Sequence, residues 1–196
     1  AEQTLRFMET VTASMVDQRP GSAEILGAHL EGPYLNPAYA GAQPRQHLRP
    51  VDLVEVQRLS ATGVVRRMTI APELDGAEEL VRLLVSAGVQ VSLGHSDCSY
   101  DLALQAVEWG ATSVTHCCNA MRPFHHRDPG LIGAALTCPA LIAELIADGV
   151  HVHPAVARAL LAARGASAVA LVSDGRLPLG LPPGEYGWVD VHAIGD

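Results

Sequence analysis

The sequence places an ionisable or coordinating side chain directly after each of five short apolar runs. These side chains belong to Glu31, His95, His116, His151 and Asp174. One carboxylate and two neutral imidazoles suit a divalent ion such as zinc, with one position left open for water. Such an ion lowers the pKa of bound water and polarises a carbonyl group, so the pattern indicates a metal site. Taken singly, a histidine at a strand end is more often structural and an aspartate there is more often a cap, so the hypothesis depends on the shared pattern.

Two loops near these residues are rich in hydrogen-bond donors. The stretch "THCCNAMRPFHHRDPGLIGAAL" (115–136) suits a polar, anionic ligand, and a solvated loop is the competing interpretation. The donors in this loop include Asn119, the Ala120 backbone and Arg127. In "YAGAQPRQHLR" (39–49), the backbone at Gly41 and Ala42 can approach a ligand closely. The basic residues of this second loop are either phosphate partners or plain surface charges.

The elements that must position these residues alternate between strand-like and helix-like patterns. Nearly continuous apolar runs predict parallel strands at 24–30, 64–70, 89–95, 112–117, 141–147 and 168–173. Helical patterns occur at 1–16, 51–63, 76–88, 99–110 and 153–165. Repeated β-α units predict a parallel α/β fold, in which a doubly wound sheet competes with a (β/α)8 barrel.

The position of the polar residues favours the barrel. Barrels carry their active sites at the carboxyl ends of the strands, where all five polar residues fall. Neither a GxGxxG nor a GxxxxGK[ST] motif is present to support a nucleotide site. We therefore predict a TIM-like (β/α)8 barrel that is incomplete, with about six strands where a closed barrel needs eight.

Composition narrows the range of partners. The chain has 196 residues, 48% of them hydrophobic, and a formal net charge of −8, which disfavours nucleic acid and anionic membranes. All 13 basic residues are arginine, so the chain offers no carboxylated lysine as a metal bridge.

The four cysteines lack CxxC spacing and are expected to be reduced thiols, with Cys117 and Cys118 packed in the core or a loop. The sequence shows no signal peptide or long apolar run, and a cytoplasmic protein is expected.

Several motifs in consistent order resemble one family. "HLEGPYLNP", "SLGHSDCSY", "THCCNAM", "IADGVHVHP" and "LVSDG" resemble the N-acetylglucosamine-6-phosphate deacetylases of the amidohydrolase superfamily, over about residues 22–186. The resemblance implies one divalent metal ion, zinc or iron(II), on Glu31, His95 and His116. It implies that Asp174 is the catalytic general base and acid, with His151 catalytic beside it. The substrate contacts that it implies are Ala42, Asn119, Ala120, Arg127 and His151.

The same resemblance implies a reaction and an assembly. Metal-activated water would attack the acetamide of N-acetylglucosamine 6-phosphate, giving glucosamine 6-phosphate and acetate, with Asp174 moving the protons. Arg127 would contact the phosphate, and His151 would help to stabilise the oxyanion. The protein would act on a small amino-sugar phosphate as a homodimer.

The chain also departs from the family pattern. The family's N-terminal His-x-His strand and the strands of its small β-sandwich are not found, so we expect one partial amidohydrolase barrel domain over 1–196 without the accessory sandwich. The loop at 175–183 differs from the family's small-residue stretch, and Arg176 is unexpected there. Two alternatives remain open: an amidohydrolase with a different N-acyl substrate, and a truncated, non-catalytic barrel that binds metal or sugar phosphate.

Overall fold

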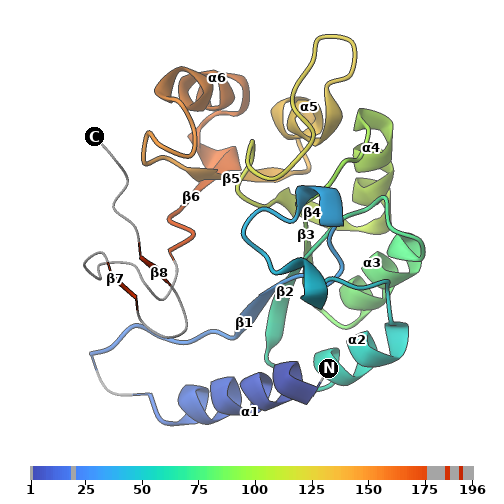
Figure 1. Ribbon diagram of the computed structural model, residues 1–196, viewed down its shortest axis with the longest axis vertical. Coiled ribbons are helices and arrows are strands. Elements are labelled where there is room, and N and C mark those ends of the chain that lie inside the picture. The colour runs from blue at the N-terminus through green and yellow to red at the C-terminus, as the bar shows by residue number, and fades with distance from the viewer. Residues whose placement is uncertain (1, 19–20, 176–183, 186–189, 192–196) are drawn as a thin grey trace.

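The centre of the molecule is a sheet of six parallel strands, as the apolar runs predict (Figure 1). The computed structural model describes residues 2–18, 21–175, 184–185 and 190–191. The strands are β1 (Ala28–Glu31), β2 (Val65–Ile70), β3 (Gln90–Leu93), β4 (Ala111–Val114), β5 (Ile142–Ile146) and β6 (Val169–Val172). The first strand is shorter than predicted, because Gly27 adopts a φ of 146° that interrupts extended backbone. A separate antiparallel pair consists of β7 (Gly184–Glu185) and β8 (Asp190–Val191).

The order of the strands decides between the two candidate folds. In the sheet the order is β1-β2-β3-β4-β5-β6, so every spatial neighbour is also the next strand in the chain. A doubly wound sheet reverses its order at one point, whereas a barrel adds strands in sequence. The six strands are therefore part of a TIM-like barrel, which confirms the predicted fold class. Because all six are parallel, their carboxyl ends lie along one edge.

Helices cover the outer side of the strands (Figure 1). They are α1 (Glu2–Val16), α2 (Leu53–Ser60), α3 (Ala77–Ser86), α4 (Tyr100–Trp109), α5 (Gly130–Thr137) and α6 (Pro154–Arg164). Single turns of 3-10 helix occur at Pro37–Tyr39, Arg45–His47 and Ala166–Ala168. The predicted cap of α4 is confirmed, since the Ser99 hydroxyl accepts from the backbone N–H of Leu102 at 3.2 Å.

The sequence does not predict α5. Its residues, GLIGAALT, are almost all apolar or small, so the helix has no polar face to produce an amphipathic pattern. Leu131, Ala134 and Ala135 are fully buried in it. The helix packs between α4 and α6, where a helix without a polar face is tolerated.

The two faces of the sheet differ in chemistry. Outward-facing residues such as Met68, Ile70, Leu93 and Val114 are fully buried and form the core together with the helices. The alternate positions are polar and are hydrogen-bonded to one another across the inner face, both between neighbouring strands and from β2 to β4. They include Arg67, Thr69, Ser92, Ser113 and Thr115. The inner face of this partial barrel is therefore a polar surface that leads to the carboxyl edge.

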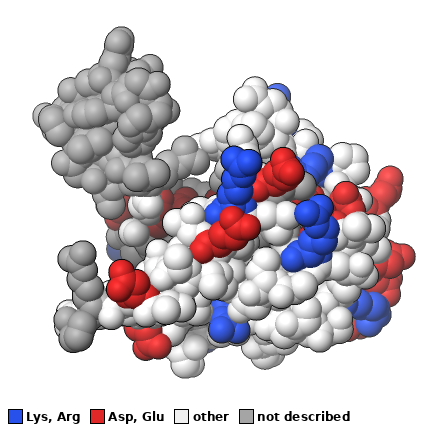
Figure 2. All heavy atoms as spheres, turned by 90° about the horizontal axis from the view of Figure 1, so that it is seen from below, with Lys and Arg blue, Asp and Glu red and all other residues white. Residues whose placement is uncertain are grey.

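The outer surface carries mixed charge. Figure 2 shows arginine and acidic side chains interspersed over one face, without an extended basic area on that face. Across the part of the chain that the structure describes, no helix combines the length and apolar character needed to cross a membrane. The predicted single partial domain over 1–196 remains a prediction.

Candidate metal centre

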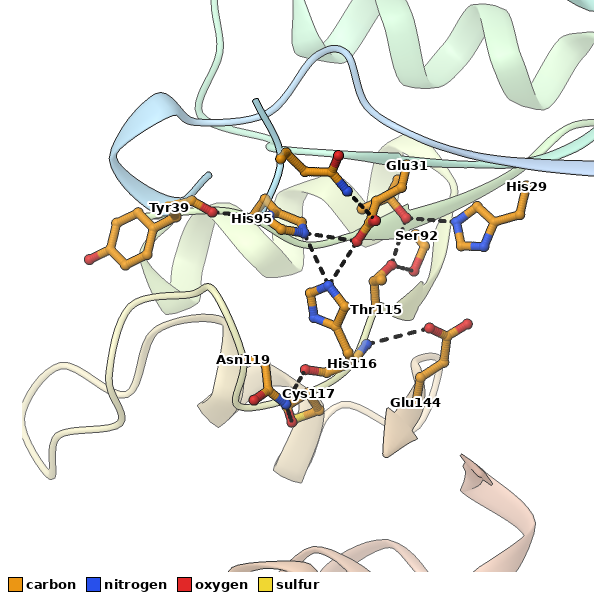
Figure 3. Close-up of polar contacts among 12 residues, drawn as sticks. His29, Glu31, Tyr39, Ser92, His95, Thr115, His116, Cys117, Asn119 and Glu144 are labelled. Atoms are coloured by element: carbon orange, nitrogen blue, oxygen red, sulfur yellow. Dashed lines mark hydrogen bonds and ion pairs between the residues drawn. The ribbon is translucent and has the colours of Figure 1, made fainter. Parts of the chain in front are cut away.

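The three predicted metal-ligand residues converge at the carboxyl edge of the sheet (Figure 3). Glu31 is the last residue of β1, and His95 and His116 follow β3 and β4. Glu31 Oε1 lies 2.8 Å from Nε2 of each histidine. The two Nε2 atoms are 3.0 Å apart, and the imidazole rings meet edge to face. One oxygen and two nitrogens therefore point at a common position.

The hydrogen bond behind His95 fixes the state of its ring. Its Nδ1 donates to the backbone carbonyl of Tyr39 at 2.7 Å, because a carbonyl oxygen can only accept. In the neutral ring the Nε2 lone pair then faces the carboxylate of Glu31. Lone pairs this close repel one another unless a proton or a cation lies between them. The residues therefore fit a divalent ion with nitrogen and oxygen ligands.

The protonation states of the cluster are coupled. Burial alone would raise the pKa of Glu31, but the hydrogen bonds from His116 and His95, when their Nε2 atoms carry protons, outweigh it and hold that pKa well below its usual range. Burial would lower the pKa of His116, but the Glu31 carboxylate raises it above its usual value, with help from Asp174. Without a metal ion, the carboxylate thus favours a protonated His116.

Backbone strain marks the strand ends. His95, His116 and Asp174 have φ values of 50°, 31° and 49° respectively, in a region that residues with a Cβ avoid. Ala120 has a φ of 47°. Such strain persists where surrounding structure enforces it, and it is common at functional sites. These turns direct the side chains out of the strand line and toward the edge.

Asp174 shares a cavity with the cluster. This cavity of about 270 Å³ is lined by His29, Glu31, Thr115, His116, Glu144, Val172 and Asp174. Asp174 follows β6 and is exposed to solvent. The cavity thus joins two residues of the cluster, Glu31 and His116, to a carboxylate from the far end of the sheet. The predicted loop at 175–183, apart from residue 175, and Arg176 lie outside the described residues.

The remaining predicted contact residues have different surroundings. Ala42 and Arg127 are exposed, whereas Asn119 and Ala120 are half-buried in the turn after His116. Asn119 donates from its side-chain amide to the His116 carbonyl at 3.2 Å. Their roles as substrate contacts stay predictions.

His151 is exposed and is held by Asp148. Its Nδ1 lies 2.6 Å from Asp148 Oδ2, while the other carboxylate oxygen of Asp148 accepts two backbone N–H groups of the same turn. These contacts, led by the His151 side chain, lower the pKa of Asp148 to about 2. Asp148 therefore orients His151 within this loop.

Sequence reasoning missed several residues that support the cluster. Gln43 donates to Glu31 Oε2 at 2.5 Å and so fixes the second carboxylate oxygen. On the inner face, His29 Nε2 lies 2.8 Å from the Thr69 hydroxyl. From Thr69 a chain of hydrogen bonds runs through the Thr115 hydroxyl to Ser92. No pattern in the sequence marks these contacts, since they join separate strands.

An ion pair lies deeper on the same face. The Arg67 guanidinium pairs with Glu144 and donates to Ser113 Oγ at 2.7 Å. The backbone carbonyl of Glu144 accepts from Cys117 N at 2.7 Å. Glu144 therefore supports the turn that carries His116 from the neighbouring strand.

A second carboxylate connects the loops. Glu73, just beyond β2, accepts from Asn36 Nδ2 at 2.9 Å, from Ser96 Oγ at 2.6 Å and from the Asp97 backbone N–H at 2.6 Å. The Tyr39 hydroxyl in turn donates to Asp97 at 2.8 Å. The loop after β1 and the loop after β3 are thus held together around His95.

The fold and the cluster together define a class. A partial TIM-like barrel with a Glu-His-His cluster at the carboxyl ends of its strands belongs to the class of barrels with a candidate divalent-metal site.

Comparisons with known proteins identify the relatives. No protein-family model matches the chain. It is 44% identical over 166 residues to N-acetylglucosamine-6-phosphate deacetylase of Bacillus subtilis, covering 84% of this chain and 42% of that protein. It is 40% identical over 172 residues to N-acetylgalactosamine-6-phosphate deacetylase of Escherichia coli O157:H7, covering 86% and 45% respectively.

Two solved structures with similar names also resemble this chain. The N-acetyl-D-glucosamine-6-phosphate deacetylase of Mycobacterium smegmatis matches with a TM-score of 0.82 and 37% identity, over 92% of this chain and 46% of that one. A mutant of that enzyme in complex with N-acetyl-D-glucosamine-6-phosphate matches with a TM-score of 0.81 and 36% identity, over 91% and 45% respectively. The resemblance seen in the motifs is confirmed: the chain is a homologue of the N-acetylglucosamine-6-phosphate deacetylases and spans less than half of their length.

Proposed function

We propose that this chain catalyses the metal-dependent hydrolysis of N-acetylglucosamine 6-phosphate to glucosamine 6-phosphate and acetate. The observation that supports this most is the convergence of Glu31, His95 and His116 in a homologue of these deacetylases. In the reaction, water adds to the acetamide carbonyl, the C–N bond breaks, and the amine leaves with a proton.

The metal proposal follows from the ligand atoms. Two imidazole nitrogens and one carboxylate oxygen suit zinc or iron(II), and we propose one such ion held by Glu31, His95 and His116. When bound, the ion supplies Lewis-acid polarisation of the carbonyl and makes water a better nucleophile at neutral pH.

The chain's own residues are proposed to move protons and hold substrate. Asp174, in the cavity beside the cluster, accepts a proton from the attacking water and later delivers one to the leaving amine. His151, held by Asp148, donates toward the developing oxyanion. The substrate contacts in the proposal are Ala42, Asn119, Ala120 and Arg127, the last of which pairs with the phosphate.

One observation favours a second substrate. The Escherichia coli relative at 40% identity is named for N-acetylgalactosamine 6-phosphate, which differs from the first substrate only at one sugar hydroxyl. Both sugars carry the same acetamide and phosphate, so the proposed roles of Asp174 and Arg127 hold for either. We further propose a cytoplasmic homodimer, which the family resemblance supports.

The proposal is tested by acetate release from each sugar phosphate, with the chain loaded with zinc or iron(II). We expect Asp174→Asn to reduce turnover by roughly 10²- to 10⁴-fold, the usual contribution of a general base, without loss of bound metal. Asp75→Asn removes an exposed carboxylate beyond β2 and is the matched control. Folded, metal-loaded chain that releases no acetate would contradict the activity, and unchanged turnover in Asp174→Asn would contradict the role of Asp174.

A further inference from the structure

We propose that Cys117 and Cys118 form a reversible thiol–disulfide switch next to the metal centre. The site is one of covalent modification by a small oxidant such as hydrogen peroxide. It relies on the proposed function only for its activity readout, because oxidation and metal binding can both be measured without turnover.

The two thiols face each other. Their sulfur atoms lie 3.9 Å apart, in direct contact, although the residues are adjacent in the chain. In an extended strand adjacent side chains point to opposite faces. Here Cys118 adopts a φ of 80°, which turns the backbone and brings its sulfur to the same side as that of Cys117. Disulfide formation therefore needs only local rotation.

The pair is accessible from one side. Cys118 is half-buried, whereas Cys117 is fully buried behind it. A peroxide molecule is small enough to reach a half-buried thiol, and it would oxidise Cys118 to a sulfenic acid with release of one water. The thiol of Cys117 then attacks this sulfur, an S–S bond forms, and a second water leaves. The two thiols lose two hydrogens in total, and the peroxide is reduced to two waters.

The disulfide would be readily reduced. The peptide between the two cysteines is trans, which fixes their Cα atoms about 3.8 Å apart, whereas ordinary disulfides join Cα atoms about 4.4–6.8 Å apart. The ring is therefore strained, and strained disulfides are the labile and regulatory ones. This strain makes the modification reversible by ordinary thiols.

The ring closed by a disulfide between Cys117 and Cys118 would act on the residues on either side of the pair, His116 and Asn119 (Figure 3). His116 precedes Cys117, and its carbonyl accepts from the Asn119 backbone N–H at 3.0 Å. Cys117 N donates to the Glu144 carbonyl at 2.7 Å, which holds this turn against β5. Rotation of the backbone at Cys118 to close the ring disturbs the bond between His116 and Asn119. The proposed metal ligand and a proposed substrate contact are thus displaced together.

The experiment treats the zinc-loaded chain with hydrogen peroxide and follows three readouts. Intact mass and peptide mapping locate the oxidation, a zinc titration gives the affinity, and acetate release gives activity. We expect a mass lower by two hydrogens, a disulfide between Cys117 and Cys118, and roughly a 10- to 100-fold weaker zinc affinity, the range seen when the support of a ligand is lost. Dithiothreitol should restore all three readouts.

Two variants provide the controls. Cys118→Ser removes the accessible thiol and should make zinc affinity insensitive to peroxide. Cys138→Ser removes another half-buried thiol, at the end of α5, and should leave the response unchanged. Oxidation elsewhere in the chain, or a disulfide at this pair with unaltered zinc affinity, would overturn the proposal. A chain that shows the expected mass and affinity changes but never releases acetate would support the switch and contradict only the proposed activity.

Discussion

Glu73 lies outside the ligand set, yet replacing it should weaken metal binding. Its carboxylate joins Asn36 in the loop after β1 to Ser96 and Asp97 in the loop after β3. Glu73→Gln keeps the shape of the side chain but removes the charge and replaces one acceptor oxygen with an amide donor. The hydroxyl of Ser96 already accepts from Cys98 N at 3.0 Å, so it cannot adapt freely.

The magnitude follows from these three bonds. A hydrogen bond to a charged group contributes about 1.5–3 kcal/mol and a neutral one about 0.5–1.5 kcal/mol, so each bond loses about 1 kcal/mol. Since Glu73 is half-buried, we expect a total loss of about 2 kcal/mol. For a chain of this length that lowers the melting temperature by about 4–8 °C. Looser support of His95 should also weaken zinc affinity roughly 10- to 100-fold.

The assay is a zinc titration combined with thermal unfolding of the metal-free chain. Glu79→Gln is the matched control, because Glu79 is an exposed glutamate on α3. A purely structural role for Glu73 would lower the melting temperature and leave zinc affinity unchanged at a temperature where the variant is folded. That outcome, or equal behaviour of the two variants, would refute the positioning role.

Two further predictions concern the same centre. Gly41→Ala should weaken zinc binding, because a Cβ at its φ of 55° would lie 3.3 Å from both Ala120 Cβ and His95 Cε1; a titration with unchanged affinity would contradict this. In chelator-treated chain, the raised pKa of His116 contributes stability that is complete below its usual 6.5 and is lost as pH rises through the folded value. The lowered pKa of Glu31 contributes stability that is present above its usual 4.5 and is lost as pH falls through the folded value. Urea unfolding should therefore show maximal stability between about 4.5 and 6.5, and a flat profile would contradict the coupling.

The fold was largely predictable because local patterns determine it. Apolar runs located all six parallel strands, and the cap at Ser99 located the start of α4. Helix α5 was missed because a buried helix without a polar face has no amphipathic period. The first strand was predicted too long, since the positive φ of Gly27 interrupts it and an added Cβ there would meet Arg66 and Val64, contacts that the local pattern does not reveal.

The site was predictable only in part. The positions of Glu31, His95 and His116 at strand ends place them on one edge once the sheet is parallel. The support from Gln43 and Glu73 was not predictable, because these contacts join loops whose paths depend on the assembled fold. Long-range hydrogen bonds of this kind leave no periodic signal in the sequence.

The consecutive order of the strands also determines which parts of the sheet and of the site are synthesised first. Each strand pairs with the one made just before it, so the sheet can grow as the chain emerges from the ribosome, with mostly short-range contacts. Glu31, His95 and His116 are all translated before β5 begins, whereas Asp174 arrives after β6. A nascent chain therefore holds all three proposed metal ligands before it holds the proposed base. Metal captured at that stage would stabilise the first four strands and serve as a template for the remaining two.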